Sequence, residues 1–218
     1  MDPTNWPGVF REGRDLFTVN LRPGERVYGE ELRTSGRVEY RQWDPFRSKL
    51  AAWLLRGANE APWAGARNVL YLGGAHGTTA SHVSDLLPHA RIFVVEKSPT
   101  SFAPLLALAR RRTNLFPILA DAQLPERYAA DVGTVEFLYQ DIAQRTQAAI
   151  FTENARTFLS SEGRGLMMLK VRSVTQTRPA PAIVHAARTE IAHGGFTVLS
   201  ESPLVPFSRE HTALLVRS

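Results

Sequence analysis

From residue 68 onward, short apolar segments alternate with segments whose apolar residues recur every three or four positions. The first pattern predicts buried strands and the second predicts amphipathic helices. Near-continuous apolar strands that alternate with helices indicate an α/β fold with a mostly parallel sheet covered on both faces. The strands are expected to end near Leu72, Glu96, Asp121, Asp141 and Lys170, with helices at about 78–87, 99–112, 145–160 and 179–193.

Two apolar segments, 196–201 and 211–216, close the chain. The nine residues between them include Pro203 and Pro206 and are too few for a crossover helix, so the last two strands should be antiparallel neighbours. A parallel sheet with one reversed strand is typical of Rossmann-like S-adenosylmethionine (SAM) methyltransferases. Dinucleotide dehydrogenases usually end in further parallel units, so this pattern favours the methyltransferase architecture.

Residues 1–43 contain short alternating segments and turns instead of helical patterns. Apolar residues alternate at 17–21 before the turn at 22–25, and 27–28 and 38–43 are further strand candidates. These segments predict a small N-terminal β subdomain.

A helix is expected to follow this subdomain, with Asp44 as N-cap and Pro45 at its first position, and to stop at Gly57. Its predicted buried stripe consists of Phe46, Leu50, Trp53 and Leu54. Lys49 lies at the edge of that stripe, where a lysine can also simply extend its amine to solvent. The expected division is a β subdomain with its connecting helix at 1–57 and a methyltransferase domain at 58–218.

The composition shows that the chain carries an excess of basic residues. The 218 residues carry a formal net charge of +5 with a pI near 10.0, which makes a polyanionic partner plausible without requiring one. Lysine occurs at only three of the 26 basic positions, so a retained lysine could be one whose titratable amine is needed. The chain has no cysteine, no apolar run of membrane-spanning length and no histidine spacing typical of a metal site. We therefore expect a cytoplasmic protein with no membrane association and no metal.

The segment after the strand at 69–72 is rich in glycine, at positions 73, 74 and 77, and a helix begins at Thr78 or Thr79. Glycines let a ligand approach the backbone, and the free N–H groups of a helix start face that ligand. Glu96 ends the next strand 23 residues after Gly73. A carboxylate at about that distance can hold an adenosine ribose.

Further polar residues at the strand ends extend the predicted pocket. Asp121 and Ala122 are placed to bind an adenine, and Asp141 to close the pocket near a methionyl amine. A nicotinamide cofactor would also use the glycine loop and Glu96 but would leave both aspartates unexplained. For methyl transfer to a hydroxyl, Lys170 is a candidate base that Asp141 would orient.

Several motifs together resemble the fibrillarin family, in its archaeal fibrillarin-like form. They span nearly the whole chain in order: Arg33-Thr-Ser35, Pro45-Phe-Arg-Ser-Lys-Leu-Ala-Ala52, Tyr71-Leu-Gly-Gly-Ala-His-Gly-Thr-Thr-Ala-Ser-His-Val-Ser-Asp85, Val94-Val-Glu-Lys-Ser-Pro99, Pro117-Ile-Leu-Ala-Asp-Ala122, Asp141-Ile-Ala-Gln-Arg-Thr-Gln-Ala148, Leu169-Lys-Val-Arg-Ser173 and Glu210-His-Thr-Ala213. The resemblance implies a SAM-dependent 2′-O-methyltransferase that acts on rRNA and tRNA. It further implies a C/D box guide RNA, a Nop-family scaffold and a ribosomal-like kink-turn-binding protein as partners.

The resemblance also implies roles for particular residues. The family's catalytic tetrad falls on Lys49, Asp141, Lys170 and His211. The expected cofactor contacts are Gly73, Gly77, Thr78, Thr79, Glu96, Lys97, Asp121, Ala122, Asp141, Ile142, Ala143 and Gln144. Two positions depart from the family pattern: His76, where serine is common, and Lys97, where an aromatic or apolar residue usually lies beside the adenosine. An NAD-dependent dehydrogenase and a non-catalytic RNA-binding subunit of the same particle remain the alternatives.

Overall fold

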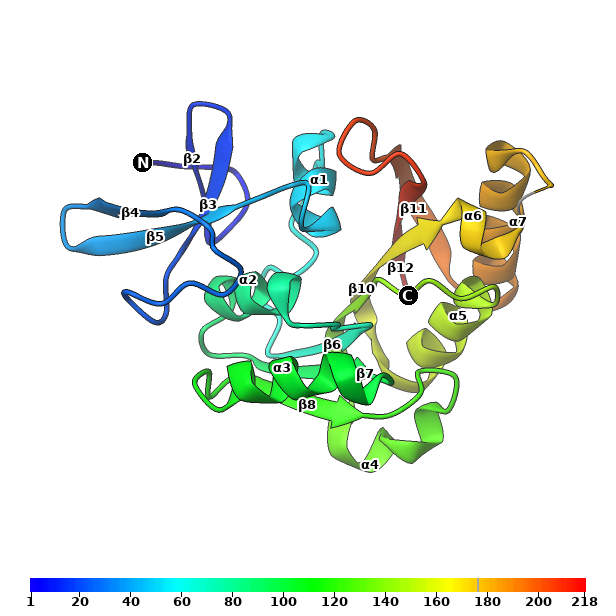
Figure 1. Ribbon diagram of the computed structural model, residues 1–218. Helices are drawn as coiled ribbons and strands as arrows, with labels where there is room; N and C mark the ends of the chain where they lie inside the picture. The colour runs from blue at the N-terminus through cyan, green and yellow to red at the C-terminus, as the bar shows by residue number, and fades with distance from the viewer. Residues whose placement is uncertain (176) are drawn as a thin grey trace.

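The computed structural model describes residues 1–175 and 177–218, which form two β-sheets and the helices packed on them (Figure 1). One sheet has seven strands in the order β11-β12-β10-β9-β6-β7-β8. Its strands are β6 (Asn68–Leu72), β7 (Arg91–Glu96), β8 (Leu115–Leu119), β9 (Val135–Gln140), β10 (Leu159–Lys170), β11 (Thr197–Pro203) and β12 (His211–Arg217).

The seven-stranded sheet is parallel except at β12, which confirms the reversed strand predicted from the short connection at 202–210. β12 pairs antiparallel with β11 on one side and with β10 on the other. The remaining pairs between β10, β9, β6, β7 and β8 are all parallel. The last strand is thus inserted next to β10, opposite Lys170, and does not lie at the edge of the sheet.

Helices cover both faces of this sheet because alternate residues of each buried strand point to opposite sides. Tyr71 and Tyr139 pack with one set of helices, and Leu70 and Leu72 pack with the other. The first set is α1 (Lys49–Leu55), α2 (Thr78–Leu86) and α3 (Pro99–Ala109). The second is α4 (Ala129–Val132), α5 (Gln147–Phe158) and α7 (Ala180–His193).

The second sheet contains only N-terminal strands, all antiparallel, in the order β1-β2-β3-β5-β4. Its strands are β1 (Asp2–Pro3), β2 (Val9–Glu12), β3 (Asp15–Val19), β4 (Leu32–Ser35) and β5 (Val38–Trp43). Leu16 and Trp43 of this sheet belong to the same buried cluster as α1 and α2. The N-terminal sheet therefore shares a hydrophobic core with one face of the larger sheet.

The structure corrects the predicted start of the first helix. α1 begins at Lys49, and Ser48, not Asp44, is its N-cap. Asp44 Oδ1 instead accepts the N–H of Phe46 at 2.8 Å, and its carbonyl accepts the N–H groups of Arg47 and Ser48, which forms a tight turn at 44–48. Phe46 consequently lies outside the helix and is 69% exposed, so its assignment to the buried stripe was wrong.

Smaller differences concern the connections. Residues 27–28 form no strand, while a 3₁₀ turn (Pro125–Arg127), α4 and the short α6 (Val171–Val174) were not predicted. Pro104 lies within α3 without ending it. No helix in the described ranges is long and apolar enough to cross a membrane, and no group of three or more possible metal ligands occurs there.

Candidate active site

The glycine loop lies at the carboxyl end of β6, where it packs against the ends of β9 and β7. Gly73 has φ +87°, and a Cβ at this position would lie 2.4 Å from the carbonyl oxygen of Asp141. A Cβ at Gly74 would lie 2.2 Å from a methyl carbon of Val94. Both positions therefore require glycine, because the loop follows its neighbours too closely for any side chain.

Two adjoining cavities lie along this loop and share Gly73, Ala75, Asp141 and Ala143. Each has a volume of about 280–290 Å³. Side by side they reach the range of roughly 300–1,000 Å³ that is usual for small-molecule sites. The first is lined by Gly73, Ala75, Val95, Glu96, Lys97, Ala120, Ala122, Asp141, Ile142, Ala143 and Gln144. The second is lined by Arg47, Lys49, Tyr71, Gly73, Gly74, Ala75, His76, Thr78, Thr79, Asp141, Ala143, Lys170 and His211.

Glu96, the last residue of β7, lines the first cavity. One carboxylate oxygen accepts the N–H of Ala75 and the other accepts the N–H of Ser98, both at 2.8 Å. Two backbone donors fix the carboxylate and leave lone pairs free for the two hydroxyls of a ribose. Lys97 Nζ lies 3.9 Å from an Asp121 oxygen, and the Lys97 side chain is about half exposed.

The second cavity contains a cluster of ionisable groups from four distant segments. Lys49, at the start of α1, donates to Asp141 Oδ2 at 2.8 Å. Lys170 and His211 are directly opposite each other where β10 pairs with β12. The prediction that Asp141 orients Lys170 is corrected, because Asp141 pairs with Lys49, and within the described ranges no carboxylate lies within 4.0 Å of Lys170 Nζ.

His211 has an unusual environment. Burial, followed by the positive charges of Lys49 and Lys170, lowers its pKa from 6.5 to about 3. The ring is therefore neutral at pH 7. Its Nδ1 is 2.8 Å from the hydroxyl of Ser208, which fixes the ring in the cavity wall.

Sequence reasoning missed several residues that support this cluster. Tyr71 lines the second cavity, and burial followed by the Asp141 charge raises its pKa well above 10. Ser48, the N-cap of α1, accepts a hydrogen bond at 3.0 Å from the hydroxyl of Thr79, one of the expected cofactor contacts. Buried Gln147 bonds both the N–H and the carbonyl of Lys170 through its amide. None of these residue types is distinctive in the sequence, since their roles depend on which strands and helices become neighbours.

Of the predicted site residues, all but Gly77 and Asp121 line the two cavities. Gly77 is the N-cap of α2, with φ +91°, and a Cβ there would lie 2.5 Å from Leu108 Cδ2. Asp121 Oδ1 accepts the N–H of Gln123, so the carboxylate stabilises the turn after β8. Both residues therefore lie beside the crevice, where Gly77 caps α2 and Asp121 stabilises a turn.

A crevice of this form at the carboxyl ends of a parallel sheet with one inserted, reversed strand defines a Rossmann-like SAM methyltransferase fold. The residues fit SAM: the glycine cradle leaves room for a ligand against the backbone, and Glu96 presents unused acceptors beside it. A family model described as Fibrillarin matches residues 3–218, and the chain belongs to that family.

Individual relatives agree with this assignment. The chain is 44% identical to the fibrillarin-like rRNA/tRNA 2′-O-methyltransferase of Aeropyrum pernix over 96% of this chain and 92% of that protein. Among solved structures, A. pernix fibrillarin with natively bound SAM has a TM-score of 0.87 at 43% identity, over 93% of this chain and 88% of that one. A fibrillarin/Nop5p complex has a TM-score of 0.87 at 35% identity, over 97% of this chain and 98% of that one.

Proposed function

We propose that this chain transfers the methyl group of SAM to the 2′-hydroxyl of ribose in rRNA and tRNA, within a ribonucleoprotein particle. The family relatives bear that activity in their names, and one related structure holds SAM. The observation that carries the proposal is the cluster of Lys49, Asp141, Lys170 and His211 in a cavity that adjoins the Glu96 cavity. A dehydrogenase would have no use for four such groups beside its cofactor.

Bound SAM supplies an electrophilic methyl group on a sulfonium. The chain must hold SAM, orient the ribose and take up the hydroxyl proton. Glu96 accepts the cofactor's ribose hydroxyls, and the N–H groups at Thr78 and Thr79 face its carboxylate. Lys97, Ala122, Ile142, Ala143 and Gln144 surround the adenosine, with Asp121 at its edge.

At the other end, Lys49 is paired with Asp141, so Lys170 is the amine left to face the substrate hydroxyl. We assign Lys170 the role of proton acceptor. Neutral His211, next to Lys170, orients the ribose and takes part in proton transfer without adding charge.

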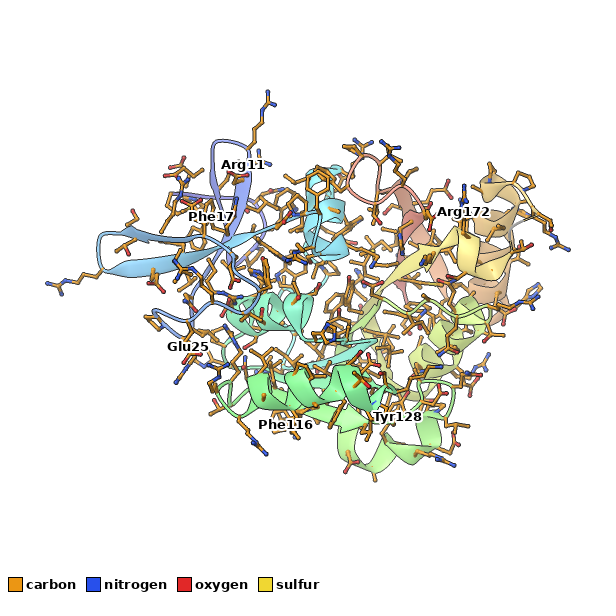
Figure 2. All side chains as sticks on the ribbon, viewed as in Figure 1. Arg11, Phe17, Glu25, Phe116, Tyr128 and Arg172 are labelled. Carbon is orange, nitrogen blue, oxygen red and sulfur yellow. The ribbon has the colours of Figure 1, made fainter. Side chains whose placement is uncertain are left out.

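The partners follow from the family. A Nop-family protein is the scaffold, as in the fibrillarin/Nop5p complex. We further propose that a C/D box guide RNA selects the target nucleotide and that a kink-turn-binding protein completes the particle. The net charge of +5 suits such an assembly, and basic residues are spread widely; Arg11 and Arg172 project at opposite ends of the molecule (Figure 2). The relatives are archaeal, and archaea have no nucleus, so we place the particle in the cytoplasm.

The decisive experiment is single-turnover methylation by the particle reconstituted from this chain, its Nop-family partner, the kink-turn protein and a guide RNA. Lys170→Met should lower the rate constant at least 100-fold and leave SAM affinity within a few-fold of wild type, since general base catalysis contributes about 10²–10⁴-fold. Exchanging the guide sequence should move the methylated nucleotide. A wild-type particle that binds SAM and RNA but transfers no methyl group would favour the non-catalytic RNA-binding subunit.

A further inference from the structure

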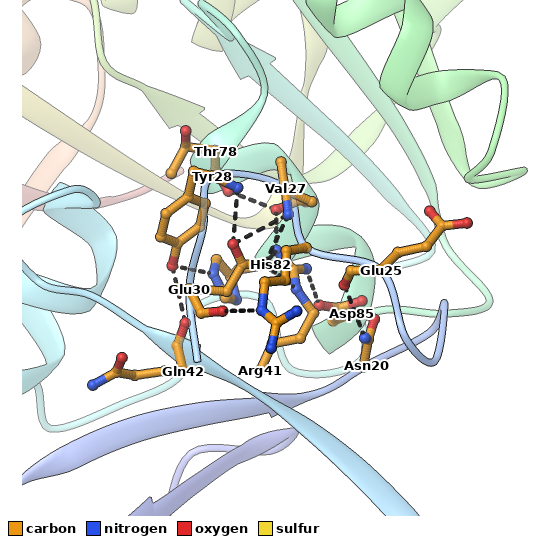
Figure 3. A network of polar contacts seen from close by, with 12 residues as sticks. Asn20, Glu25, Val27, Tyr28, Glu30, Arg41, Gln42, Thr78, His82 and Asp85 are labelled. Atoms are coloured by element: carbon orange, nitrogen blue, oxygen red, sulfur yellow. Dashed lines mark hydrogen bonds and ion pairs between the residues drawn. The ribbon is translucent and has the colours of Figure 1, made fainter. Parts of the chain in front are cut away.

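A buried ionic cluster joins the N-terminal sheet to α2, outside the cavities described above (Figure 3). Arg41 of β5 is fully buried and contacts Glu30 at 2.6 Å and Asp85 of α2 at 2.6 Å. Arg112, just after α3, contacts the other Asp85 oxygen at 2.6 Å. The side chain of Arg112 is only 2% exposed, so this ion pair is buried as well.

The cluster fixes α2 against the N-terminal sheet. Its two arginines and two carboxylates balance in charge, and breaking such a buried arrangement by removing one partner is costly. Asp85 also accepts bonds from the Thr18 hydroxyl and the N–H of Leu21. The position of α2 is therefore set by the N-terminal sheet as well as by the core beneath it.

α2 in turn is linked to the turn at 44–48 once directly and once through Tyr28. At its start, Thr79 bonds Ser48, the residue before Lys49. One turn later, Nε2 of buried His82 lies 2.8 Å from the Tyr28 hydroxyl, which accepts the N–H of Asp44 at 3.4 Å. The turn that precedes Lys49 is thus bonded at both ends. Its first residue, Asp44, is bonded to Tyr28, which contacts His82, and its last residue, Ser48, is bonded to Thr79.

We propose that Tyr28 and His82 are positioning residues for methyl transfer: they fix the turn at 44–48 so that Lys49 lies against Asp141. A lysine side chain has high rotamer freedom, so its contact with Asp141 depends on where its backbone begins. The connection between β3 and β4, which carries Tyr28, then acts on the reaction from a distance, through hydrogen bonds and without touching SAM. The kinetic part of this inference rests on the proposed methyltransferase activity.

Matched substitutions separate this role from general stability. Tyr28→Phe removes the hydroxyl that joins His82 to Asp44 and that also donates to the Gln42 carbonyl at 2.9 Å. His82→Gln can place an amide near the Nε2 position and retain the Tyr28 contact, whereas His82→Asn reaches only toward the Nδ1 partner, Thr18. Trp6→Phe is the control, because it removes a buried hydrogen bond from Trp6 Nε1 to Ala58 in the N-terminal region that does not lead to the turn.

Two measurements test the proposal. In the reconstituted particle at saturating SAM, Tyr28→Phe and His82→Asn should lower the single-turnover rate constant about ten- to 100-fold, the effect of a misplaced catalytic group. His82→Gln and Trp6→Phe should stay within about threefold of wild type, and SAM affinity should change little in all four. Combining Tyr28→Phe with His82→Asn should cost less than the sum of the two single effects, because both remove the contact between Tyr28 and His82.

The second measurement does not depend on RNA methylation. The chain has only three lysines, so selective ¹³Cε-lysine labelling gives an NMR spectrum in which Lys49 is assigned through Lys49→Arg. The Lys49 signal should shift or broaden in Tyr28→Phe and His82→Asn but not in His82→Gln or Trp6→Phe. An unchanged Lys49 signal in all variants would overturn the positioning role, whatever the particle's activity. Full methylation by Tyr28→Phe and His82→Asn, with only the melting temperature lowered, would overturn it as well. If the wild-type particle transferred no methyl group but the Lys49 signal still shifted in these two variants, only the proposed function would be contradicted.

Discussion

Neutral His211 gives a pH dependence of stability that can be worked out from the structure. Its pKa is about 3 in the folded protein, against 6.5 for an unburied histidine. As the pH falls through 6.5, the unfolded chain takes up a proton at this position and the folded protein does not. The unfolded state is then favoured, so the folded state loses stability between pH 6.5 and pH 3.

The size of the effect follows from the two pKa values. Between pH 7 and pH 5, His211 alone should remove about 2 kcal/mol from the free energy of unfolding. Replacing it with asparagine removes the titration while keeping a polar group that can reach the Ser208 hydroxyl. The variant should therefore lose about 2 kcal/mol less stability than wild type over the same pH interval.

Urea unfolding at pH 7, 6 and 5, followed by circular dichroism, measures this difference. His89→Asn is the matched control, because it makes the same substitution at an exposed position in the turn between α2 and β7. If wild type and His211→Asn lose stability in parallel between pH 7 and pH 5, then His211 is not held neutral by Lys49, Lys170 and burial. The electrostatic account of the cluster would then be wrong.

Three further substitutions test other parts of the structure. Glu96→Gln should weaken SAM binding at least about tenfold, measured by calorimetry, because it replaces a charged acceptor held by two N–H groups; an unchanged affinity would place the ribose elsewhere. Gly73→Ala should abolish SAM binding because its Cβ would overlap the Asp141 carbonyl, whereas Gly133→Ala, also at positive φ but with no atom within 4 Å, should only lower the melting temperature. Asp85→Ala should lower the free energy of unfolding by about 3–5 kcal/mol in urea, since it deprives buried Arg112 of its carboxylate; a loss below about 1 kcal/mol would contradict the buried cluster.

The first helix illustrates where local sequence rules failed. Asp44-Pro45 satisfies the usual requirements for a helix start, and the same aspartate is equally able to bond the backbone of a turn. Tertiary contacts decide between them: the Tyr28 hydroxyl binds the N–H of Asp44, and Thr79 binds the true N-cap, Ser48. The four-residue delay moves Lys49 from the middle of the predicted helix to its first position, where its amine reaches Asp141.

The sequence alone determined the alternation of strands and helices, the reversed strand, the glycine loop and the acid 23 residues beyond it. These features are local, because periodicity, turn residues and short spacings act within a few tens of residues of each other. Only the tertiary structure decided that Asp141 pairs with Lys49 instead of Lys170, that Arg112 is buried, and that His82 lies between the N-terminal sheet and the turn before Lys49. Each of those contacts joins residues far apart in the chain, so its existence depends on which surfaces the folded core brings together.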